Sequence, residues 1–580
     1  MQLQRIRIQN FRSLDDVEFH TPSPVALVGE NNSGKTNILE AIYWLLTEDA
    51  WPLSRRLEPI DFHLNRVEIP IRICAWFDVD AEETSYFGRS HRNNLLQARW
   101  QPGRGGQPQL GIGLSRTLRG SENDWFAFVD HNGDPIQYGR QSAPLLRRIS
   151  SEDHEWFDAV LIGARREASR TFGGQSWTAW SRLLRDLVLS VPAADRAEID
   201  EKLAQAAREA KPLVVADLER DLNAEISRIL PVKAAITDIE LSPMSLEDAF
   251  RAAQLYVSDP LRTSLDAKGM ALQSAATMGL YLVKSQLRPS CVLLIEEPEL
   301  FLHPHNQRLL LRELARRAES ASGLLYSSHS PALIPLGQPD HVLLARRPET
   351  ATDLSQISGT RLDELKAEGL NVSKLARPFD ASRNELFFAR SVLLVEGEAD
   401  RQAVHAVLSA DGIEPDALGI SVIDVGGDGN VADYALLCRE LAVPTICLLD
   451  KRGNEGAQRK AEAACDRIFW MEPDLELAFL DSSSLTEEFV VANIGEALVS
   501  QAAESIVRDH AMELNDARRE ALRRLLKRAV GVSWPSDVVS AIVEEGTLPH
   551  ALRAAVDAAL AIGQPSPTAA AADSEEELPF

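Results

Sequence analysis

The sequence predicts an α/β fold built from two α/β regions in series. The first is indicated by an apolar run, Val25–Val28, followed by a Gly-rich turn and an amphipathic helix from about Thr36. The second is indicated by strand-like and helical segments that alternate after about residue 391, as in a parallel sheet. At 580 residues, the chain is long enough for more than one domain.

The elements of the first region follow one another in a readable order. Apolar and polar residues alternate around Ile6–Ile8 and Val17–Phe19, which predicts two half-buried strands. Shorter strand signals occur at 69–73 and 126–128. From about 150 to 230, leucines recur at helical spacing and prolines interrupt them, which predicts a mainly helical insertion.

Composition excludes several classes of protein. No uncharged apolar run reaches the roughly 18–20 residues that cross a bilayer, and Met1–Phe11 is not followed by the apolar segment of a secretory signal. Five irregularly spaced cysteines without a Cys-x-x-Cys pair argue against a disulfide framework and the usual zinc pattern. We therefore expect a cytoplasmic protein without a membrane partner. A net charge of −25 argues against a passive, histone-like nucleic-acid binder.

A phosphate-binding loop is the clearest motif. Gly29-Glu-Asn-Asn-Ser-Gly34-Lys35-Thr36 fits G-x-x-x-x-G-K-[ST] and lies between a buried strand and a helix, the context that distinguishes it from an incidental glycine turn. Backbone N–H groups cradle phosphates in such a loop, the lysine neutralises them, and the Thr36 hydroxyl ligates Mg²⁺. The residues expected to hold ATP here are Gly29, Asn32, Gly34, Lys35, Thr36 and Asn37.

An acidic strand end follows much later in the chain. The run Leu293–Ile295 is apolar and ends in Glu296 and Glu297. We assign Glu296 to Mg²⁺ and Glu297 to polarisation of the attacking water, as in nucleotide hydrolases. A polar loop after a core strand is the alternative. His329 follows a second apolar run, where a histidine can contact a γ-phosphate.

In this order the motifs resemble an ABC-type ATPase head of chromosome-maintenance and DNA-repair proteins. Lys268–Ser274 resembles a degenerate signature motif, Leu300–Pro304 the D-loop, and His329 the switch histidine; Glu296 replaces the usual aspartate. In such heads the signature of one subunit completes the nucleotide site of another. The resemblance therefore implies dimerisation around ATP, with nucleotide contacts from Gly269, Gln273 and Ser274, a segment that has no evident role in its own subunit.

A second group of carboxylates ends the strands of the second region. Glu396 follows the apolar run Leu393–Val395, Asp400 opens the next helix, and Asp450 ends a later strand. Parallel strands bring these acids to the carboxyl edge of one sheet, where α/β sites lie. Carboxylates so close repel one another unless cations lie between them, and oxygen ligands favour Mg²⁺ or Mn²⁺. Ordinary helix-capping carboxylates are the alternative.

This second region resembles a Toprim domain, and a head followed by Toprim is the architecture of the OLD (overcoming lysogenization defect) family of ATP-dependent nucleases. The resemblance implies metal-binding roles for Glu396, Asp400 and Asp450 and a catalytic lysine, for which Lys527 is the candidate. Arg452 stands where the family has the second aspartate of Asp-x-Asp. The acids that could substitute for it are Glu455, Asp474 and Glu476.

The predicted organisation follows from these motifs. Residues 1–385 form an ABC-type ATPase domain with a helical dimerisation insert at about 150–235, and 386–562 form a Toprim-like nuclease domain with C-terminal helices. Residues 563–580 are Ala-, Pro- and Glu-rich and are expected to be disordered. Asp509–Val530 is predicted as a basic helical stretch.

Basic side chains in that stretch have two interpretations. They neutralise DNA phosphates near the carboxylates, or they form a solvated helix face paired with nearby acids. The residues are Arg518, Arg519, Arg523, Arg524, Lys527 and Arg528. A smaller cluster is Arg165, Arg166 and Arg170, and the resemblance hints at a structural or nucleotide-linked role for Arg166.

Three functions remain open at this point. The first is a metal-dependent DNA endonuclease gated by an ABC-type ATPase, which the resemblance connects with phage defence or DNA repair. The second is an ATP-driven DNA-binding clamp or sensor with an inactive Toprim site, favoured by Arg452. The third is a structural DNA-repair ATPase, against which the acidic strand ends after 391 count. The expected partners are DNA and further copies of the chain, with a helicase-like protein left open.

Overall fold

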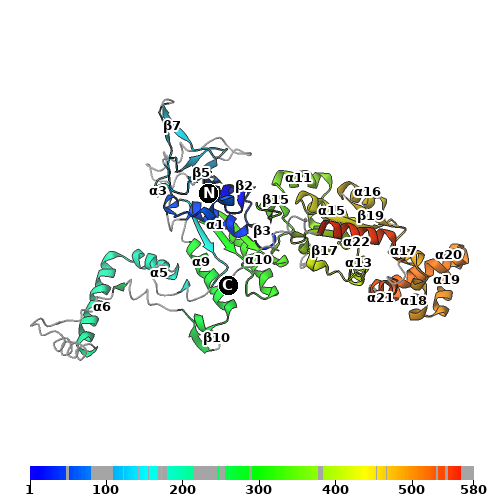
Figure 1. The fold of residues 1–580 in the computed structure, drawn as a ribbon. Helices are drawn as coiled ribbons and strands as arrows, with labels where there is room; N and C mark the ends of the chain where they lie inside the picture. Colours follow the sequence, from blue (N-terminus) through cyan, green and yellow to red (C-terminus); the bar gives the residue numbers. More distant parts are fainter. Residues whose placement is uncertain are drawn as a thin grey trace, which may run out of the picture.

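The structure of the protein is a computed structural model (Figure 1). It describes residues 1–47, 51–79, 109–121, 123–140, 143–154, 156–166, 171–172, 179–214, 245–246, 255–259, 261–286, 291–375, 383–451, 454–465, 467–530, 533–542 and 547–563. None of the helices within these ranges has an apolar stretch that would span a bilayer.

A six-stranded sheet carries the phosphate-binding loop. Its strand order is β15-β14-β3-β13-β12-β9, and every neighbouring pair is parallel except β14 with β15. The strands are β3 (Val25–Val28), β9 (Asp158–Ile162), β12 (Cys291–Glu296), β13 (Gly323–Ser328), β14 (Val342–Arg346) and β15 (Asp353–Gln356). Strand β3 is fully buried and pairs in parallel with β13 and β14. The loop after it therefore lies at the carboxyl edge of the sheet, where the acidic end of β12 also lies.

An antiparallel sheet of order β2-β1-β4-β5-β6 lies next to it and shares a hydrophobic core with α1 (Lys35–Leu46). Its strands are β1 (Gln2–Phe11), β2 (Leu14–His20), β4 (Ile71–Asp78), β5 (Gln109–Arg116) and β6 (Trp125–Val129). The strands predicted at 6–8, 17–19, 69–73 and 126–128 are thus confirmed, with β4 beginning at Ile71. A short hairpin, β7 (Gln137–Arg140) and β8 (Ala143–Leu146), follows β6.

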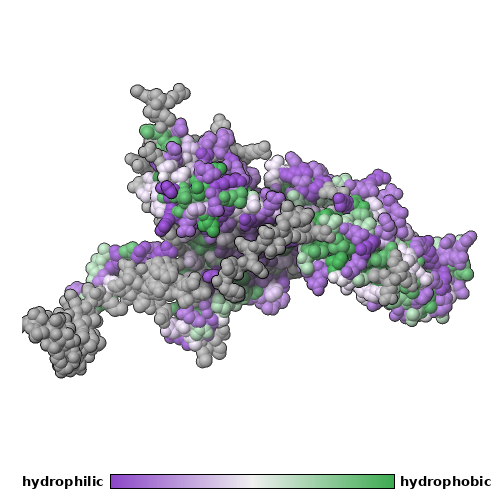
Figure 2. Space-filling view, in the orientation of Figure 1, coloured by the Kyte–Doolittle hydropathy of each residue, from purple (hydrophilic) through white to green (hydrophobic). Residues whose placement is uncertain are grey.

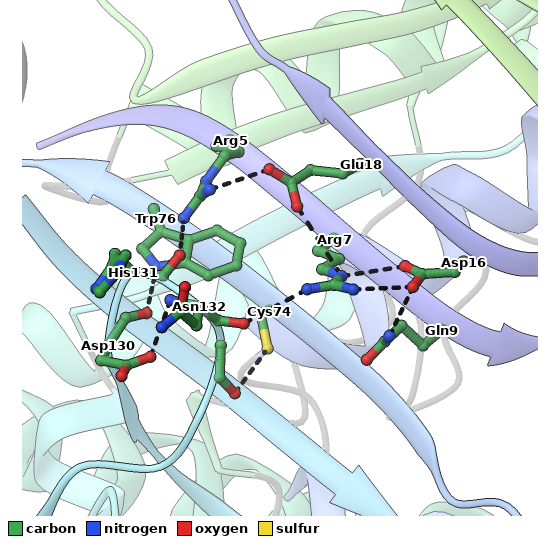
Figure 3. Close-up of polar contacts among 11 residues, drawn as sticks. Arg5, Arg7, Gln9, Asp16, Glu18, Cys74, Trp76, Asp130, His131 and Asn132 are labelled. Carbon is green, nitrogen blue, oxygen red and sulfur yellow. Dashed lines mark hydrogen bonds and ion pairs between the residues drawn. The ribbon is translucent and has the colours of Figure 1, made fainter.

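Two arginines of β1 fasten the loop after β6 to the outer face of this sheet (Figure 3). The guanidinium of Arg5 lies 3.8 Å from the ring centroid of Trp76 and donates to the carbonyl of His131. Arg7 donates to the carbonyl of Asn132 in the loop at 3.5 Å, and it donates two hydrogen bonds to Asp16 on β2, of 3.0 and 2.8 Å. These contacts hold the loop and the sheet together.

The segment predicted as mainly helical from about 150 contains a core strand, which corrects that prediction. Residues 158–162 form β9, a mainly apolar strand that pairs in parallel with β12. The apolar run Ala159–Ile162 was the available signal, and it is too short for a helix. The helices α3 (Ser151–His154), α5 (Ala179–Ser190) and α6 (Ala193–Val214) are as expected. Helices α5 and α6 project away from the two sheets of the first region (Figure 1), and residues 215–244 lie outside the described part.

The remaining elements of the first region return the chain to the sheet. The hairpin β10 (Tyr256–Asp259) and β11 (Leu261–Ser264) precedes α9 (Met270–Gln286), which packs on β9 and β12. After β12 comes α10 (Pro304–Ala318), and after β15 come α11 (Gly359–Glu368) and α12 (Val372–Leu375).

The second region contains the predicted parallel sheet. Its order is β17-β16-β18-β19, and all three pairings are parallel. The strands are β16 (Ser391–Val395), β17 (Ile420–Asp424), β18 (Thr445–Asp450) and β19 (Ile468–Met471). The associated helices are α13 (Glu398–Ala410), α14 (Pro415–Leu418), α15 (Asp428–Glu440), α16 (Glu455–Ala464) and α22 (His550–Gly563). One hydrophobic cluster contains both Leu344 of the six-stranded sheet and Leu394 of this one, so the two regions are packed against each other.

Five further helical segments form the far end of the molecule (Figure 1). They are α17 (Leu475–Ser482), α18 (Ser484–Ile494), α19 (Glu496–His510), α20 (Leu514–Leu525) with a π-helical extension Leu526–Val530, and α21 (Trp534–Ile542). The predicted helical stretch Asp509–Val530 is therefore interrupted, because α19 ends at His510 and the next residue, Ala511, has a φ of 52°. Figure 2 shows mainly hydrophilic residues over α19 and α20. The tail after 563 lies outside the described residues.

Candidate functional site

The phosphate-binding loop needs its two glycines for steric reasons. Gly29 has a φ of 139° and Gly34 has a φ of 99°. A residue with a Cβ atom would be strained in this backbone conformation. A Cβ on Gly29 would lie 2.0 Å from the carbonyl oxygen of Ala345, and one on Gly34 would lie 2.3 Å from Oγ1 of Thr352. The loop therefore packs tightly on the carboxyl end of β14, and α1 begins directly after it at Lys35.

Lys35 is held inside the loop. Its Nζ donates to the carbonyl oxygens of Gly29 at 2.9 Å and Glu30 at 2.6 Å, and to Oγ of Ser33 at 3.2 Å. Burial lowers the pKa of this ammonium to about 8, although the carboxylate of Glu297 opposes the shift. A bound phosphate would offset that desolvation by supplying negative charge.

A cavity of about 300 Å³ opens over the loop. It is lined by Asn31, Asn32, Ser33, Gly34, Lys35, Thr36, Asn37, Glu297, Ser327, His329 and Arg347. Most residues expected to hold the nucleotide thus lie around one space, while Gly29 contributes its carbonyl to Lys35. Sequence reasoning missed Ser327 and Arg347. Arg347 directly follows β14, so recognising that strand would have brought it to the same sheet edge.

Glu297 and His329 face each other across this cavity. The Oε1 of Glu297 lies 3.8 Å from Nε2 of His329. Burial and the nearby charge of Lys35 lower the pKa of His329, so the imidazole is neutral at pH 7. The N–H of Glu297 donates to the carbonyl of Ser327 at 3.0 Å, which fixes the acid against β13.

Glu299 is a further acid that the sequence did not assign. Its Oε1 accepts from Oγ of Ser328 at 2.9 Å and from the backbone N–H of His329 at 2.7 Å. The side chain is buried, and burial raises its pKa. Glu299 therefore positions the strand end that carries His329. The Leu300–Pro304 turn that resembles a D-loop leads from it into α10, which His303 caps.

Glu296 has a different set of partners from Glu297. Its Oε2 accepts from the backbone N–H of Ala164 at 3.1 Å, and its buried Oε1 has no hydrogen-bond partner in the described part of the chain. Among the described residues that line the nucleotide cavity, Glu296 does not occur. Its assignment to Mg²⁺ stays a prediction, and the geometry connects it with the β9 side of the sheet.

Arg166 links this acid to the predicted signature segment. It is 1% exposed, and it donates to the carbonyl of Glu296 and to Oγ of Ser274 at 3.1 Å. Burial lowers its pKa to about 10. The role hinted for Arg166 is thus compatible with a structural contact. Arg165 is exposed, and Arg170 lies outside the described residues.

The expectation that Gly269–Ser274 has no role in its own subunit is wrong. Ser274 is 0% exposed and bonded to Arg166, and Gln273 donates to the carbonyls of Asp266 and Lys268 at 3.1 and 2.8 Å. Burial of small polar groups requires such partners, which a sequence motif does not reveal. Gly269 directly precedes α9, and its contact with a nucleotide on another subunit stays a prediction.

The second carboxylate group lies at the carboxyl edge of the second sheet, as predicted. Oε1 of Glu396 accepts from the N–H of Asp450, Oδ2 of Asp400 from the N–H of Gly397, and Oδ1 of Asp450 from the N–H of Leu475, each at 3.0 Å. Asp400 also caps α13, so the capping alternative is correct for one of its oxygens.

Burial and mutual repulsion raise the pKa values of these acids. Burial, Asp400 and Glu396 together raise the pKa of Asp450 to about 9, and burial and Glu396 raise the pKa of Asp400 to about 7. Burial, opposed by the N–H of Asp450, raises the pKa of Glu396. Glu476 adds to the repulsion at both aspartates. Without a cation, Asp450 therefore carries a proton at neutral pH, and Asp400 is about half protonated.

Glu476 is the candidate that best replaces the acid missing at 452. It is 4% exposed, and its buried Oε2 has no hydrogen-bond partner among the described residues. Asp474 instead accepts from Leu477 and pairs with Arg523 at 2.7 Å, while the 85% exposed Glu455 approaches Arg459 at 3.6 Å. Arg452 lies outside the described residues.

The type of ligand atom that these acids offer suits divalent cations. All four acids offer oxygen ligands, the type preferred by Mg²⁺ and Mn²⁺, and the unpartnered oxygen of Glu476 needs a positive neighbour. Within the described ranges, no three such side chains are already arranged as a metal-holding group, so metal binding by these acids stays a prediction. We call Glu396, Asp400, Asp450 and Glu476 the carboxylate basin. Lys527 lies at its rim, with Nζ 3.9 Å from Oε1 of Glu476 and a side chain 64% exposed.

The basic face of α20 is largely paired. Arg518 contacts Glu487 and Glu496, and Arg519 contacts Asp481. Arg523 and Arg524 both pair with Glu520. The interpretation as a paired helix face is therefore favoured for these four arginines. Lys527 and Arg528 are the exposed cations of the group that lie nearest the end of the helix.

Comparisons with known proteins cover both regions. Residues 1–101 match a family described as an AAA ATPase domain, and residues 277–334 match an AAA domain described as putative AbiEii toxin, Type IV TA system. Residues 387–451 match the Overcoming lysogenization defect protein-like TOPRIM domain.

Relatives with both regions align over most of their length. The OLD nuclease of Thermus scotoductus strain SA-01 is 26% identical over 516 residues, 82% of this chain and 91% of that protein. The Old nuclease of Escherichia phage P2 is 20% identical over 78% of this chain and 77% of its own length. Endonuclease GajA of Bacillus cereus strain VD045 is 23% identical over 79% of this chain and 77% of its own length. The chain is therefore similar to OLD nucleases over most of its length, and it combines an ATPase region with a Toprim nuclease region.

Proposed function

We propose that this chain is an ATP-hydrolysing, divalent-metal-dependent DNA endonuclease, in which the ATPase region gates cleavage by the Toprim region. The observation that carries the proposal is the basin of Glu396, Asp400, Asp450 and Glu476, whose mutual repulsion calls for cations. Relatives named as nucleases, one of them an endonuclease, support phosphodiester hydrolysis as the reaction.

In the ATPase region, each role follows from position around the cavity. Lys35 neutralises phosphate charge, and Thr36 offers a hydroxyl for Mg²⁺ at the start of α1. Glu297 accepts a proton from the attacking water. The neutral His329, whose Nε2 lies 3.8 Å from Oε1 of Glu297, donates a hydrogen bond toward the terminal phosphate. Glu299 keeps His329 in place through the backbone.

In the Toprim region, the four acids would hold the cations, with Mg²⁺ or Mn²⁺ as the ions of choice. When bound, such cations activate water and stabilise the leaving oxygen. Lys527 offsets charge that develops on the scissile phosphate, for which its exposed position at the rim is suitable. Lys527 and Arg528 also offer charge to the DNA backbone.

Self-association is the second part of the proposal. Helices α5 and α6 extend from the ATPase region, and they and the head are the surfaces through which two copies would meet (Figure 1). Sedimentation at micromolar concentration, with and without ATP, tests it. A monomer under both conditions would exclude it. The proposed domains are the ATPase domain at 1–385 and the Toprim domain at 386–562.

Plasmid nicking tests the cleavage function. The parent should nick supercoiled DNA with Mg²⁺ or Mn²⁺ and stop on chelation, and Glu396→Ala should lower the rate by orders of magnitude with ATP hydrolysis nearly unchanged. Glu455→Ala is the matched control, because that acid is 85% exposed and outside the basin. A parent that never cuts with any metal, yet hydrolyses ATP and binds DNA, would be the clamp or sensor instead.

A further inference from the structure

Two cysteines behind the carboxylate basin lie in direct contact. The Sγ atoms of Cys447 and Cys465 are 2.8 Å apart, although the residues are 18 positions apart in the sequence. Cys447 is buried in β18, three residues before Asp450, and Cys465 is partly exposed where α16 ends. The contact thus joins the strand that carries a proposed metal ligand to the helix that follows it.

Backbone hydrogen bonds hold both cysteines in this arrangement. The N–H of Cys447 donates to the carbonyl of Arg467, and that of Cys465 to the carbonyl of Ala461, each at 2.9 Å. A disulfide needs an S–S distance of about 2.05 Å, so the two sulfurs must approach by only about 0.8 Å. Little rearrangement of the strand or the helix is needed.

The surroundings favour a disulfide over the alternatives. Cys438 is a third thiol nearby, but it is fully buried on α15, and burial raises its pKa to about 12, which suppresses its thiolate. A thiolate metal site is not supported, because the described residues contain no group of three Cys, His, Asp or Glu side chains that could hold an ion. Cys465 is the thiol of the three that solvent reaches.

We propose that Cys447 and Cys465 are an oxidisable dithiol that forms a reversible disulfide. A peroxide is the oxidant: the Cys465 thiolate attacks its oxygen to give a sulfenic acid, and the Cys447 thiol displaces the hydroxyl as water. Overall, two thiols and one H₂O₂ give one disulfide and two waters, and a dithiol reductant reverses the reaction. The bond would close a loop from β18 through α16 that includes Asp450. Its formation does not depend on the proposed cleavage function.

The test is mass analysis of the folded full chain after mild H₂O₂ treatment. We expect a loss of 2 Da and one linked peptide pair containing Cys447 and Cys465, both reversed by dithiothreitol. Cys465→Ser should abolish the link, and Cys438→Ser should keep it. Circular dichroism before and after treatment establishes that the chain is folded.

Hydrogen exchange supplies a second readout. Peptides from α16 should exchange more slowly in the oxidised parent than in the reduced parent, with no such difference in Cys465→Ser. The proposal is overturned if folded protein keeps both thiols under peroxide, if Cys465 links to Cys438 instead, or if exchange in α16 is unaffected by the bond.

Discussion

The Nε of Arg390 lies 3.4 Å from Oε1 of Glu30, so the residue before the first Toprim strand contacts the phosphate-binding loop. Both side chains are about half exposed, and such a pair alone contributes little. A half-buried contact accompanies it: Arg346 at the end of β14 donates to the carbonyls of Ala442 at 2.6 Å and Ala389 at 3.3 Å. The next residue, Arg347, lines the nucleotide cavity. The two regions are thus joined where nucleotide would bind.

Arg346→Ala should therefore uncouple the two activities. It removes two hydrogen bonds at the junction, one exposed and one partly buried, each of which contributes about 0.5–1.5 kcal/mol. ATP hydrolysis should stay within about twofold of the parent, while the effect of ATP on nicking should disappear. Measuring nicking across an ATP titration checks this. Arg316→Ala, which removes an exposed arginine paired within α10, is the control. Unchanged ATP dependence in Arg346→Ala would show that coupling runs elsewhere.

ATP hydrolysis should depend on Lys35 and Glu297 in different ways. Lys35→Ala should abolish nucleotide binding, because it removes the ammonium beside the phosphates. Glu297→Gln should bind ATP normally but hydrolyse it roughly 10²–10⁴-fold more slowly, since it removes the proton acceptor. Equilibrium binding and phosphate release separate the two effects. Hydrolysis at the parent rate in Glu297→Gln would exclude this residue as the base, and Glu299→Gln would then be the next variant to measure.

Glu476→Gln should weaken metal binding at the Toprim site by about 10–100-fold, the range seen when a group supporting a metal site is lost. The substitution keeps the shape of the side chain and removes the charge that repels Asp400 and Asp450. Mn²⁺ titration followed by electron paramagnetic resonance measures the affinity, with Glu455→Gln as the exposed control.

Arg452→Asp gives a complementary measurement. If Glu476 supplies the missing ligand, the parent should cut well and Arg452→Asp should change the nicking rate little. If the parent nicks DNA slowly and Arg452→Asp raises the nicking rate, the arginine weakens metal binding at this site and Glu476 does not replace the lost acid.

The sequence predicted those parts of the sites in which local pattern and chemistry coincide. Strand-then-acid patterns correctly brought Glu396 and Asp450 to one sheet edge, because strand order in a parallel sheet leaves few alternatives. It did not separate Glu476 from Asp474 and Glu455, because partner choice depends on the tertiary position of Arg523 on α20. It also misjudged Ser274, whose partner Arg166 lies 108 residues away in sequence.

Metal binding at the Toprim site should strengthen as pH rises. In the absence of cation the pKa values of Asp400 and Asp450 are raised to about 7 and about 9, above the unfolded value of about 3.9. Each group is protonated in the folded chain and ionised in the unfolded chain between those values, so the metal-free protein loses stability as pH rises from about 4 to about 9. A cation must displace these protons, so its affinity should increase by up to about tenfold per pH unit for each proton released. Mn²⁺ titrations at pH 6.5, 7.5 and 8.5 should show rising affinity together with proton release, and Asp450→Asn should flatten the rise above pH 7.5. An affinity independent of pH in the parent would mean that these carboxylates are already ionised and that their repulsion is relieved by another positive group.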